Sequence, residues 1–407
     1  MVERRFMNNV IEVNQNIVYV KGAFRGAIYN FNNGNVYSIN NDACKIIEEF
    51  IDNQRIDKPY LVELEKMGLI TADFSPKEYR FSKIEKELNF VWLELTESCN
   101  LRCLHCYDGD EHKDNFSEKL SFEQWKDVLF QLKKLNCKRI EFIGGEPTVY
   151  PYFFDLLKYA VSLGLKTDIY SNLLLFSDEL VGFIKEHEIT VHFSIYGSNG
   201  EVHDSVTCRK GSFEKTIYWV KKLVSNDIKV IPAITIMRKN QDDYENTIQF
   251  VKSLGVETKL IAVDTVRATN KRCVLNLTPT GKAKLISLRQ KPNFSTTREF
   301  FEKAYSTNTC LFGKFTIQPN GNLSPCEFSR DIIYGNVKKN SINEILESDV
   351  LNSFWFLDFS KISDCKNCEY RFACKDCRMI TIHENLYLKN TRCLYNPKTG
   401  TWNTDLF

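Results

Sequence analysis

Cysteine is the residue type whose number and spacing could support chemistry in this sequence. The chain has 407 residues and fourteen cysteines, of which three lie near position 100 and seven follow residue 300. Reduced cysteines at short spacings in a long chain favour metal ligation over a disulfide framework. The sequence therefore predicts metal-binding groups in two separate regions.

The first group is a CxxxCxxC pattern formed by Cys99, Cys103 and Cys106. It directly follows a predicted strand, and Tyr107 follows the third cysteine. Three thiolates on one loop can hold three irons of a cubane cluster, which leaves the fourth iron open to a substrate or cofactor. A structural zinc site would instead be closed by a fourth protein ligand, and His105 is the alternative candidate for that position.

Alternating strands and helices must position this loop. Apolar runs predict strands at Phe90–Leu95, Arg139–Ile143, Lys166–Tyr170, Ile189–Ile195, Lys229–Ile236 and Glu257–Val263. Helical periodicity lies between them, and Ser121 with Gln124 forms a capping-box pattern at the first helix. The pattern predicts a parallel sheet, either doubly wound or part of a barrel, with ligands at the carboxyl ends of its strands.

Several further motifs follow these strands in order, and together with the cysteine loop they resemble the radical S-adenosylmethionine (SAM) superfamily. Gly144-Gly145-Glu146-Pro147 comes about 40 residues after the loop and resembles the family's GGEP. The resemblance implies that this motif contacts the methionine amino group of SAM, with glycines that let the backbone approach the ligand. It assigns further SAM contacts to Ser171, Asn172, Ser194 and Arg209, although Arg209 could equally be a solvated loop residue.

The resemblance also implies the fold, the cofactors and the chemistry. The fold would be a partial (β/α)6 barrel within an α/β protein. The cofactors would be SAM and a [4Fe-4S] cluster on Cys99, Cys103 and Cys106. Electron transfer into SAM would yield a 5′-deoxyadenosyl radical that abstracts hydrogen from an unactivated C–H bond.

The second cysteine group resembles the SPASM extension of this superfamily, which holds two auxiliary iron-sulfur clusters, expected to be [4Fe-4S]. By position, one cluster would take Cys365, Cys368, Cys374 and Cys393, and the one nearer the barrel would take Cys310, Cys326 and Cys377. The latter has either an open iron or a distant fourth ligand such as Cys273. A pair of zinc knuckles is the alternative from spacing alone. Cys44 and Cys137 are interpreted as small buried hydrophobes.

Residues 1–82 form a separate predicted module. Asn33-Gly34 lies between two β-rich runs and predicts a hairpin, and two short amphipathic helices follow. The module resembles the winged-helix-like α+β domain that binds precursor-peptide leaders by strand addition. A lid or oligomerisation domain is the alternative. The predicted domains are therefore 1–82 for leader recognition, 83–295 for the radical SAM barrel and 296–407 for the auxiliary clusters.

These expectations describe a maturase of ribosomally made peptides, and the favoured product is a thioether from cysteine sulfur to carbon. Carbon–carbon or carbon–oxygen crosslinking, epimerisation, formylglycine formation as in anaerobic sulfatase maturases, and a non-catalytic iron-sulfur or zinc scaffold remain alternatives. Its partners would be a precursor peptide and a reductase or a flavodoxin- or ferredoxin-type electron donor.

Composition and charge exclude other classes of protein. The net charge is +2, from 54 basic and 52 acidic residues, so nucleic acid is not an expected partner. No apolar run approaches the roughly 18 residues of a membrane span, and the start lacks a secretory signal, so we expect a cytoplasmic protein. The sequence does not select a catalytic acid or base among Asp204, Asp264, Tyr196 and His383.

Overall fold

The computed structural model describes residues 9–106, 119–265, 294–380, 385–390 and 393–402. The chain divides into two compact units. We call residues 86–285 and 313–352 the sheet unit, and residues 1–85, 286–312 and 353–407 the terminal unit. The division into three domains at residues 82 and 295 stays a prediction.

The sheet unit is built on consecutive parallel strands. These are β6 (Phe90–Glu94), β7 (Ile140–Ile143), β8 (Thr167–Ser171), β9 (Thr190–Ser194), β10 (Val230–Ile236) and β11 (Ala262–Thr265). Each strand pairs with the next one in sequence. A doubly wound sheet would reverse its strand order at a switch point, so the sequential order belongs to a barrel-type sheet. The predicted parallel sheet is confirmed.

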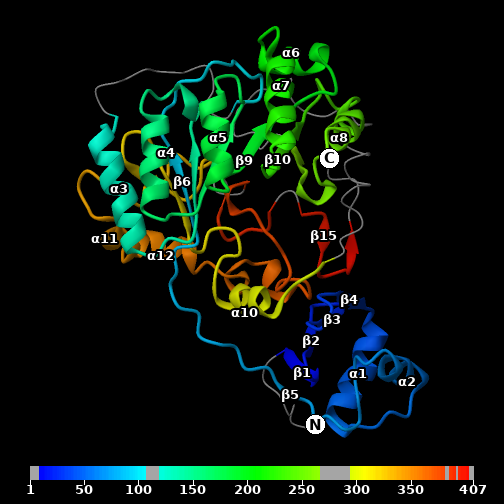
Figure 1. The fold of residues 1–407 in the computed structure, drawn as a ribbon. Coiled ribbons are helices and arrows are strands. Elements are labelled where there is room, and N and C mark those ends of the chain that lie inside the picture. Colours follow the sequence, from blue (N-terminus) through cyan, green and yellow to red (C-terminus); the bar gives the residue numbers. More distant parts are fainter. Residues whose placement is uncertain (1–8, 107–118, 266–293, 381–384, 391–392, 403–407) are drawn as a thin grey trace. The chain divides into compact units, whose positions relative to one another are not determined.

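Helices connect these strands and lie along one face of the sheet (Figure 1). They are α3 (Phe122–Lys134), α4 (Phe153–Ser162), α5 (Asp178–Glu186), α6 (Gly200–Thr207), α7 (Ser212–Ser225) and α8 (Tyr244–Ser253). The capping box at Ser121 is present, because its hydroxyl accepts from the backbone of Gln124 and the Gln124 side chain accepts in return. Two 3-10 helices, η2 (Pro147–Val149) and η3 (Thr258–Leu260), complete this part of the chain.

The two faces of the parallel sheet differ in polarity. The face toward the helices is apolar; Phe142, for example, is fully buried and packs edge-on against Phe153 of α4. The opposite face, here called the inner face, carries Trp92, Glu141, Asp168, Tyr170, His192 and Ser194. Side chains alternate along a strand, so the same short strands supply both an apolar core and a polar lining.

Three elements differ from the sequence-based expectation. The last parallel strand begins at Ala262 and not at Glu257, because only residues Ala262–Thr265 pair with β10. Residues Thr258–Leu260 form η3 instead. Helix α6 was not predicted; Asn199 caps it by accepting from the backbone of Val202. The strands β12 (Lys314–Ile317), β13 (Asn322–Ser324) and β14 (Gly335–Asn336) were also missed. Strand β12 pairs in parallel with β6 and extends the sheet to nine strands.

The terminal unit contains a five-stranded antiparallel sheet in the order β4-β3-β2-β1-β5. Its strands are β1 (Val10–Asn14), β2 (Ile17–Lys21), β3 (Gly26–Asn30), β4 (Val36–Ile39) and β5 (Lys77–Glu78). The predicted hairpin is present, because β3 and β4 pair across the loop that contains Asn33-Gly34. Helices α1 (Asn41–Asn53) and α2 (Pro59–Lys66) follow, and the apolar side of α1 is buried. A winged-helix likeness stays a prediction.

The remaining elements are short and lie in the last hundred residues or so. They are α10 (Arg298–Ser306), α11 (Ile342–Leu346), α12 (Asp349–Trp355), the 3-10 helices η5 (Phe359–Lys361), η6 (Cys365–Asn367) and η7 (Arg378–Ile380), and the paired strands β15 (Tyr395–Asn396) and β16 (Thr401–Trp402).

The amino-terminal sheet and the cysteine-rich segment share one core. Phe301 of α10 is fully buried and makes edge or tilted ring contacts with Tyr29 and Phe372. The Tyr29 hydroxyl donates to the carbonyl of Glu369 at 2.6 Å, and the backbone N–H of Ala23 donates to the carbonyl of Asn367 at 2.8 Å. The segment that carries the cysteines therefore gains apolar packing from residues more than 300 positions away.

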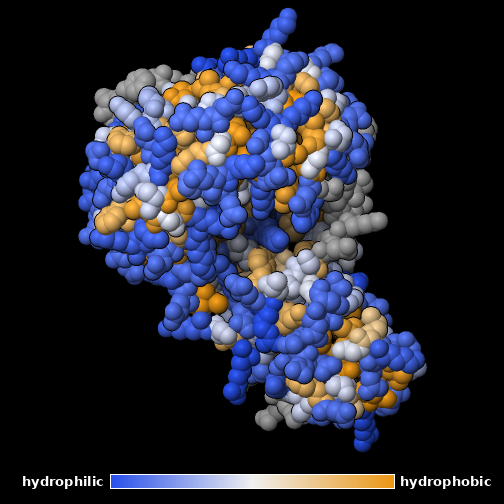
Figure 2. All heavy atoms as spheres, viewed as in Figure 1, coloured by the Kyte–Doolittle hydropathy of each residue, from blue (hydrophilic) through white to orange (hydrophobic). Residues whose placement is uncertain are grey.

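The visible face is mainly hydrophilic, with small separate apolar patches (Figure 2). Within the described residues, no helix has the length and apolarity that a bilayer crossing requires.

A buried ion pair links β6 to the segment after β13, and its loss should destabilise the sheet unit. Arg330 lies 2.5 Å from Glu94, which is fully buried, and 2.7 Å from Glu97. We expect Arg330→Met to cost about 3–5 kcal/mol of unfolding free energy, because Glu94 loses its cation in a buried site. The measurement is the midpoint of urea unfolding under anaerobic conditions.

The matched control is Lys138→Met, which removes the exposed pair with Glu87 and should change stability by less than about 1 kcal/mol. Equal effects of the two substitutions would contradict the prediction.

Candidate functional site

The cysteine loop leaves the carboxyl end of β6 and is held by backbone hydrogen bonds to the end of α6. The N–H groups of Arg102 and Leu104 donate to the carbonyls of Thr207 and Val206, at 3.1 and 2.9 Å. Cys103 and Leu104 also pack against a small apolar cluster of Tyr196, Val206 and Met237. The loop that was predicted to bind metal is therefore fixed on two sides by the sheet unit.

The three thiols of this loop are close neighbours but do not form a single-ion site. Burial raises the pKa of Cys99 to about 11, and Cys106 contributes to that increase. Among these described residues, no three ligand atoms of Cys99, Cys103, Cys106 and His105 lie within 4.8 Å of one another. A tetrahedral zinc ion with sulfur ligands at ~2.3 Å needs them ~3.8 Å apart.

The two glycines after β7 are required by the packing of one loop against another. A Cβ on Gly144 would lie 2.7 Å from the carbonyl oxygen of Thr96. A Cβ on Gly145 would lie 2.5 Å from the carbonyl oxygens of both Glu97 and Ser98. We expected these glycines to let the backbone approach a ligand. The structure shows that they let the β7 loop approach the residues that lead into the cysteine loop.

Glu146 organises the ends of two strands. Its carboxylate is 1% exposed and accepts from the Ser171 hydroxyl at 2.7 Å, the Asn172 N–H at 2.8 Å, and the N–H and hydroxyl of Thr148. Burial raises the pKa of Glu146, and these hydrogen bonds act in the opposite direction. The carboxylate thus fixes the loop after β7 to the end of β8.

Asn172 extends this network to the cysteine loop. Its side-chain amide donates to the side-chain oxygen of Asn100 at 2.6 Å, and Asn100 lies between the first and second cysteines. Arg209 contacts the same residue, because its guanidinium donates to the carbonyl oxygen of Asn100 at 2.8 Å. Arg209 is therefore placed against the loop.

Ser194 ends β9 on the inner face, where its hydroxyl donates to the hydroxyl of Tyr170 at 3.3 Å. Together with Gly144, Gly145, Glu146, Ser171, Asn172 and Arg209, it belongs to the same carboxyl-end region of the sheet unit. The structure therefore brings together the residues that the resemblance assigned to SAM. Their roles as SAM contacts stay predictions.

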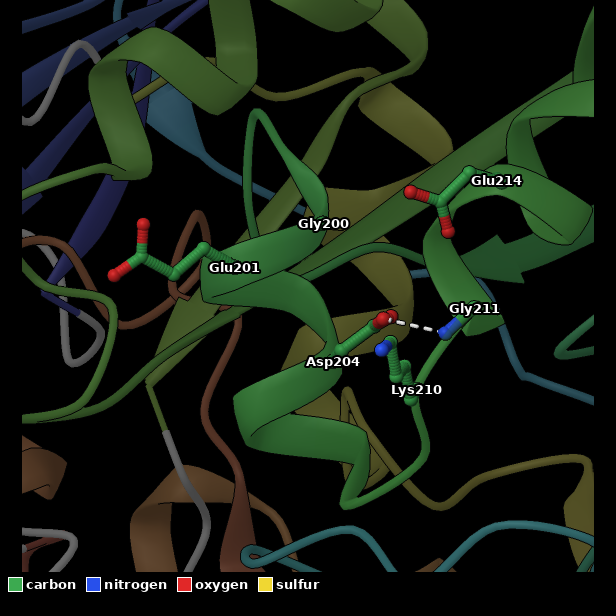
Figure 3. Close-up of a pocket in the computed structure, with 6 residues that line it drawn as sticks. All are labelled: Gly200, Glu201, Asp204, Lys210, Gly211 and Glu214. Carbon is green, nitrogen blue, oxygen red and sulfur yellow. Dashed lines mark hydrogen bonds between the residues drawn. The ribbon is translucent and has the colours of Figure 1, made fainter.

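A surface hollow of about 680 Å³ lies beside this region, lined by α6 and the start of α7 (Figure 3). Asp204 accepts from the backbone of Gly211 and Phe213 and from the Ser212 hydroxyl, at 2.6, 2.9 and 2.7 Å. Burial favours the neutral acid, but these hydrogen bonds outweigh it and lower the pKa of Asp204. Asp204 thus stabilises the start of α7, which explains it without an acid–base role.

The other three acid–base candidates gain no catalytic support. Tyr196 is buried; its backbone N–H donates to Nδ1 of His203, and its ring packs edge-on against His105. His383 lies outside the described residues, and Asp264 lies on β11.

The terminal unit groups four of the later cysteines. Burial raises the pKa of each thiol of Cys365, Cys368, Cys374 and Cys393. Repulsion by others of the same four adds to the increase for Cys365, Cys368 and Cys374. This set is the one that the resemblance assigned to a single auxiliary cluster.

The second predicted auxiliary set is divided between the two units. Cys310 and Cys377 lie in the terminal unit, whereas Cys326 lies in the sheet unit. Thr309, next to Cys310, donates to the carbonyl of Cys374 at 3.2 Å. Cys273 and Tyr107 lie outside the described residues.

Sequence reasoning missed two contributors to the site. Asn100 joins the loop to β8, and its only sequence signal is its place between two ligand cysteines. Arg330 holds the segment after Cys326 against β6, and nothing in the local sequence points to its partner Glu94, which is 236 residues away.

Two family models match this chain. Residues 93–251 match the Radical SAM superfamily, and residues 309–369 match SPASM, an iron-sulfur cluster-binding domain. The matched segments include the loop after β6, the GGEP motif, Ser194, Arg209, Cys310, Cys326, Cys365 and Cys368.

Curated relatives come from more than one functional class. The antilisterial bacteriocin subtilosin biosynthesis protein AlbA of Bacillus subtilis is 28% identical over 74% of this chain and 69% of its own length. The sporulation killing factor maturation protein SkfB of the same organism is 28% identical, covering 62% of this chain and 63% of its own length. The AdoMet-dependent heme synthase of Methanosarcina barkeri is 23% identical, covering 70% and 89%.

A solved structure shares the fold over nearly the whole chain. Streptococcus suis SuiB bound to S-adenosylmethionine superposes with a TM-score of 0.60 over 97% of this chain and 99% of that one, at 15% identity. The chain therefore contains a Radical SAM domain and a SPASM iron-sulfur domain, and it shares its fold with SuiB. Peptide maturases are among its homologues.

The two domains imply SAM, a [4Fe-4S] cluster and auxiliary iron-sulfur clusters, and the donor sets fit them. The loop after β6 offers three neighbouring thiols, and the terminal unit offers four. The side-chain amide nitrogen of Asn100 and Nδ1 of His105 are buried without a hydrogen-bond partner among the described residues. A group bound beside the three thiols would supply partners for these unpaired polar atoms.

Substitution of Glu146 by glutamine should loosen the site. Glutamine keeps the shape but places an NH2 group against donors, at a cost of about 1–3 kcal/mol. We expect Glu146→Gln to lower the urea midpoint and to weaken SAM binding, measured by equilibrium dialysis. The matched control is Glu186→Gln on the exposed end of α5, which should leave both unchanged. A wild-type midpoint and SAM affinity in Glu146→Gln would contradict the assigned role.

Proposed function

We propose that this enzyme matures a ribosomally made precursor peptide by forming thioether crosslinks from cysteine sulfur to carbon. The observation that carries the proposal is the convergence of the cysteine loop, the GGEP loop and the end of β8 through Glu146, Asn172 and Asn100. AlbA and SkfB, named for bacteriocin biosynthesis and killing-factor maturation, support peptide as the substrate class.

The residues of the chain would divide the work as follows. Cys99, Cys103 and Cys106 hold the cluster and leave one iron for SAM. When bound, these groups supply a 5′-deoxyadenosyl radical that abstracts hydrogen from a C–H bond. Glu146 and Asn172 fix the strand ends around SAM, and the contacts to SAM come from the backbone of Gly144–Glu146 with Ser171, Asn172, Ser194 and Arg209.

The later cysteines would hold auxiliary iron-sulfur clusters, which would supply an acceptor for the electron that remains after hydrogen abstraction. Cys365, Cys368, Cys374 and Cys393 hold one auxiliary cluster, and Cys310, Cys326 and Cys377 hold the other. An open iron in the second cluster would suit a substrate thiolate, which favours a thioether over other crosslinks. The terminal electron donor is a reductase or a flavodoxin- or ferredoxin-type protein.

The amino-terminal sheet would bind the leader of the precursor at the edge of β4. Part of this edge is already paired: the N–H of Val36 donates to the carbonyl of Phe294, and the N–H of Thr296 donates to the carbonyl of Gly34. Backbone N–H groups point to alternate sides along a strand, so Ser38 is the next residue after Val36 whose N–H points away from β3. A leader strand would therefore add to β4 beyond Val36.

Co-expression tests the reaction. The enzyme is expressed anaerobically with each short reading frame adjacent to its gene, and the peptides are analysed by mass spectrometry. We expect the loss of two hydrogens per crosslink and cysteines that no longer react with iodoacetamide. Altered chirality at unchanged mass would indicate epimerisation, and conversion of cysteine to an aldehyde would indicate formylglycine. Reduced holoenzyme that releases no 5′-deoxyadenosine from SAM would overturn the enzymatic proposal.

The auxiliary assignment is tested by iron content. Cys365→Ala should lower the iron by about four atoms per chain relative to the reconstituted wild type, since one cubane cluster is lost. Cys310→Ala should lower iron content and crosslinking. The control is Cys137→Ala, which changes a buried thiol that contacts only the carbonyl of Arg139 among the hydrogen-bond partners described. Full crosslinking and unchanged iron in Cys310→Ala would count against its assignment.

The leader site is tested by a backbone substitution. Ser38→Pro removes one edge N–H and should weaken the binding of the leader peptide, whereas Ser38→Ala keeps the N–H and should bind it normally. Fluorescence anisotropy of a labelled leader measures both. Equal affinities of the two variants would place the leader elsewhere.

A further inference from the structure

Three metal-ligating side chains meet on the inner face of the sheet unit, away from the cysteines. Glu141 of β7 and Asp168 of β8 are paired in register, and His192 of β9 lies on the same face beside them. One ligand atom from each residue lies within 4.8 Å of the others. The three strands are consecutive neighbours in the sheet, so ordinary strand alternation brings the side chains together.

The distances within this group are those of ion pairs and are long for hydrogen bonds. Nε2 of His192 lies 3.5 Å from Oε1 of Glu141 and 3.7 Å from Oδ2 of Asp168. Both separations exceed the range of a normal N–H···O hydrogen bond. Ligands bound at about 2.1 Å in a tetrahedral site lie ~3.4 Å apart, which is close to both distances. The two distances from His192 therefore match ligands that share one ion, and the third separation, between Glu141 and Asp168, is within 4.8 Å.

The group also contains buried polar atoms without partners. Glu141 is 4% exposed and Asp168 is 2% exposed. Among the described residues, Oε1 of Glu141, Oδ1 of Asp168 and Nε2 of His192 have no hydrogen-bond partner. Burial raises the pKa of Glu141 to about 7. Each carboxylate thus keeps one oxygen without a hydrogen-bond donor among the described residues, while the other oxygen of Asp168 is paired with Arg139. A bound cation would satisfy these two remaining oxygens.

Neighbouring side chains orient the two carboxylates. Arg139 donates to Oδ2 of Asp168 at 2.8 Å, and Trp92 donates to Glu141. The ring of Tyr170 stacks against that of His192, with centroids 6.0 Å apart. Metal ligands are commonly held in this way by a second layer of hydrogen bonds and packing.

We propose that Glu141, Asp168 and His192 bind one divalent transition-metal cation, with its remaining coordination positions open to the inner face of the sheet. One imidazole nitrogen and two carboxylate oxygens form a donor set that suits Zn²⁺, Mn²⁺ or Fe²⁺ rather than a thiolate-selective ion. This site is independent of the iron-sulfur clusters and of the proposed peptide chemistry.

The test is metal binding by the reconstituted holoenzyme. The protein is assembled anaerobically with iron and sulfide, passed over a chelating resin, and titrated separately with Mn²⁺ and Zn²⁺. Free Mn²⁺ is followed by electron paramagnetic resonance, and bound zinc by elemental analysis. We expect one cation per chain beyond the cluster iron, and a thermal midpoint that rises when the cation is added.

Isosteric or near-isosteric variants assign the ligands. Glu141→Gln and His192→Gln should each weaken cation binding by at least about tenfold while they keep the iron content of the wild type. The control is His187→Gln, which changes an exposed histidine at the end of α5 and should bind the cation normally. Glu141→Gln removes a buried charge, so its thermal midpoint without added metal should not fall.

Three results would overturn the proposal. The first is wild-type cation affinity in both ligand variants, and the second is no bound cation at millimolar Mn²⁺ and Zn²⁺ in the wild type. The third is unchanged metal content with weaker precursor binding in Glu141→Gln, which would show that these side chains bind a basic group of the substrate and not a metal ion. Both readouts are independent of crosslinking activity, so failure here leaves the proposed function untouched.

Discussion

The buried carboxylate of Glu146 is the constraint on which the arrangement of the site depends. A carboxylate that is 1% exposed must find donors within the protein, and here they come from the turn after β7 and from the end of β8. Asn172, held by this carboxylate, then binds Asn100 in the cysteine loop. Three segments that are separate in sequence are therefore held together at one place, as a site that must orient a reactive group requires.

The inner face of the parallel sheet also carries buried charged groups that need partners within the protein. Short strands alternate between the helix-covered core and a polar lining, so charged side chains are buried wherever the lining is enclosed. Two buried carboxylates of this lining pair with arginines from other segments of the chain: Glu94 pairs with Arg330, and Asp168 pairs with Arg139. The pairing of β12 with β6 brings the tail segment that carries Arg330 and Cys326 to the sheet. The pairing of β12 with β6 therefore positions the predicted cluster ligand Cys326 as well as this part of the sheet.

The terminal unit shows how a cysteine-rich segment obtains a core. Its own sequence offers few apolar faces, and the structure packs Phe372 against Phe301 and the Tyr29 side of the amino-terminal sheet. The backbone N–H of Ala23 and the hydroxyl of Tyr29 donate to the carbonyls of Asn367 and Glu369, on either side of Cys368. The module proposed to bind the leader is therefore also part of the scaffold around four neighbouring thiols.

The sequence by itself determined the features that depend on near neighbours along the chain. The CxxxCxxC loop, the GGEP motif, the capping box at Ser121 and the hairpin at Asn33-Gly34 are set by local spacing and backbone preference, and the parallel sheet follows from hydrophobic periodicity. Only the tertiary structure decided which distant groups meet. It supplied β12 beside β6, Asn100 beside Asn172, the loop contact that requires Gly144 and Gly145, and the group of Glu141, Asp168 and His192. These depend on pairing and burial between segments far apart in the chain, which no local pattern encodes.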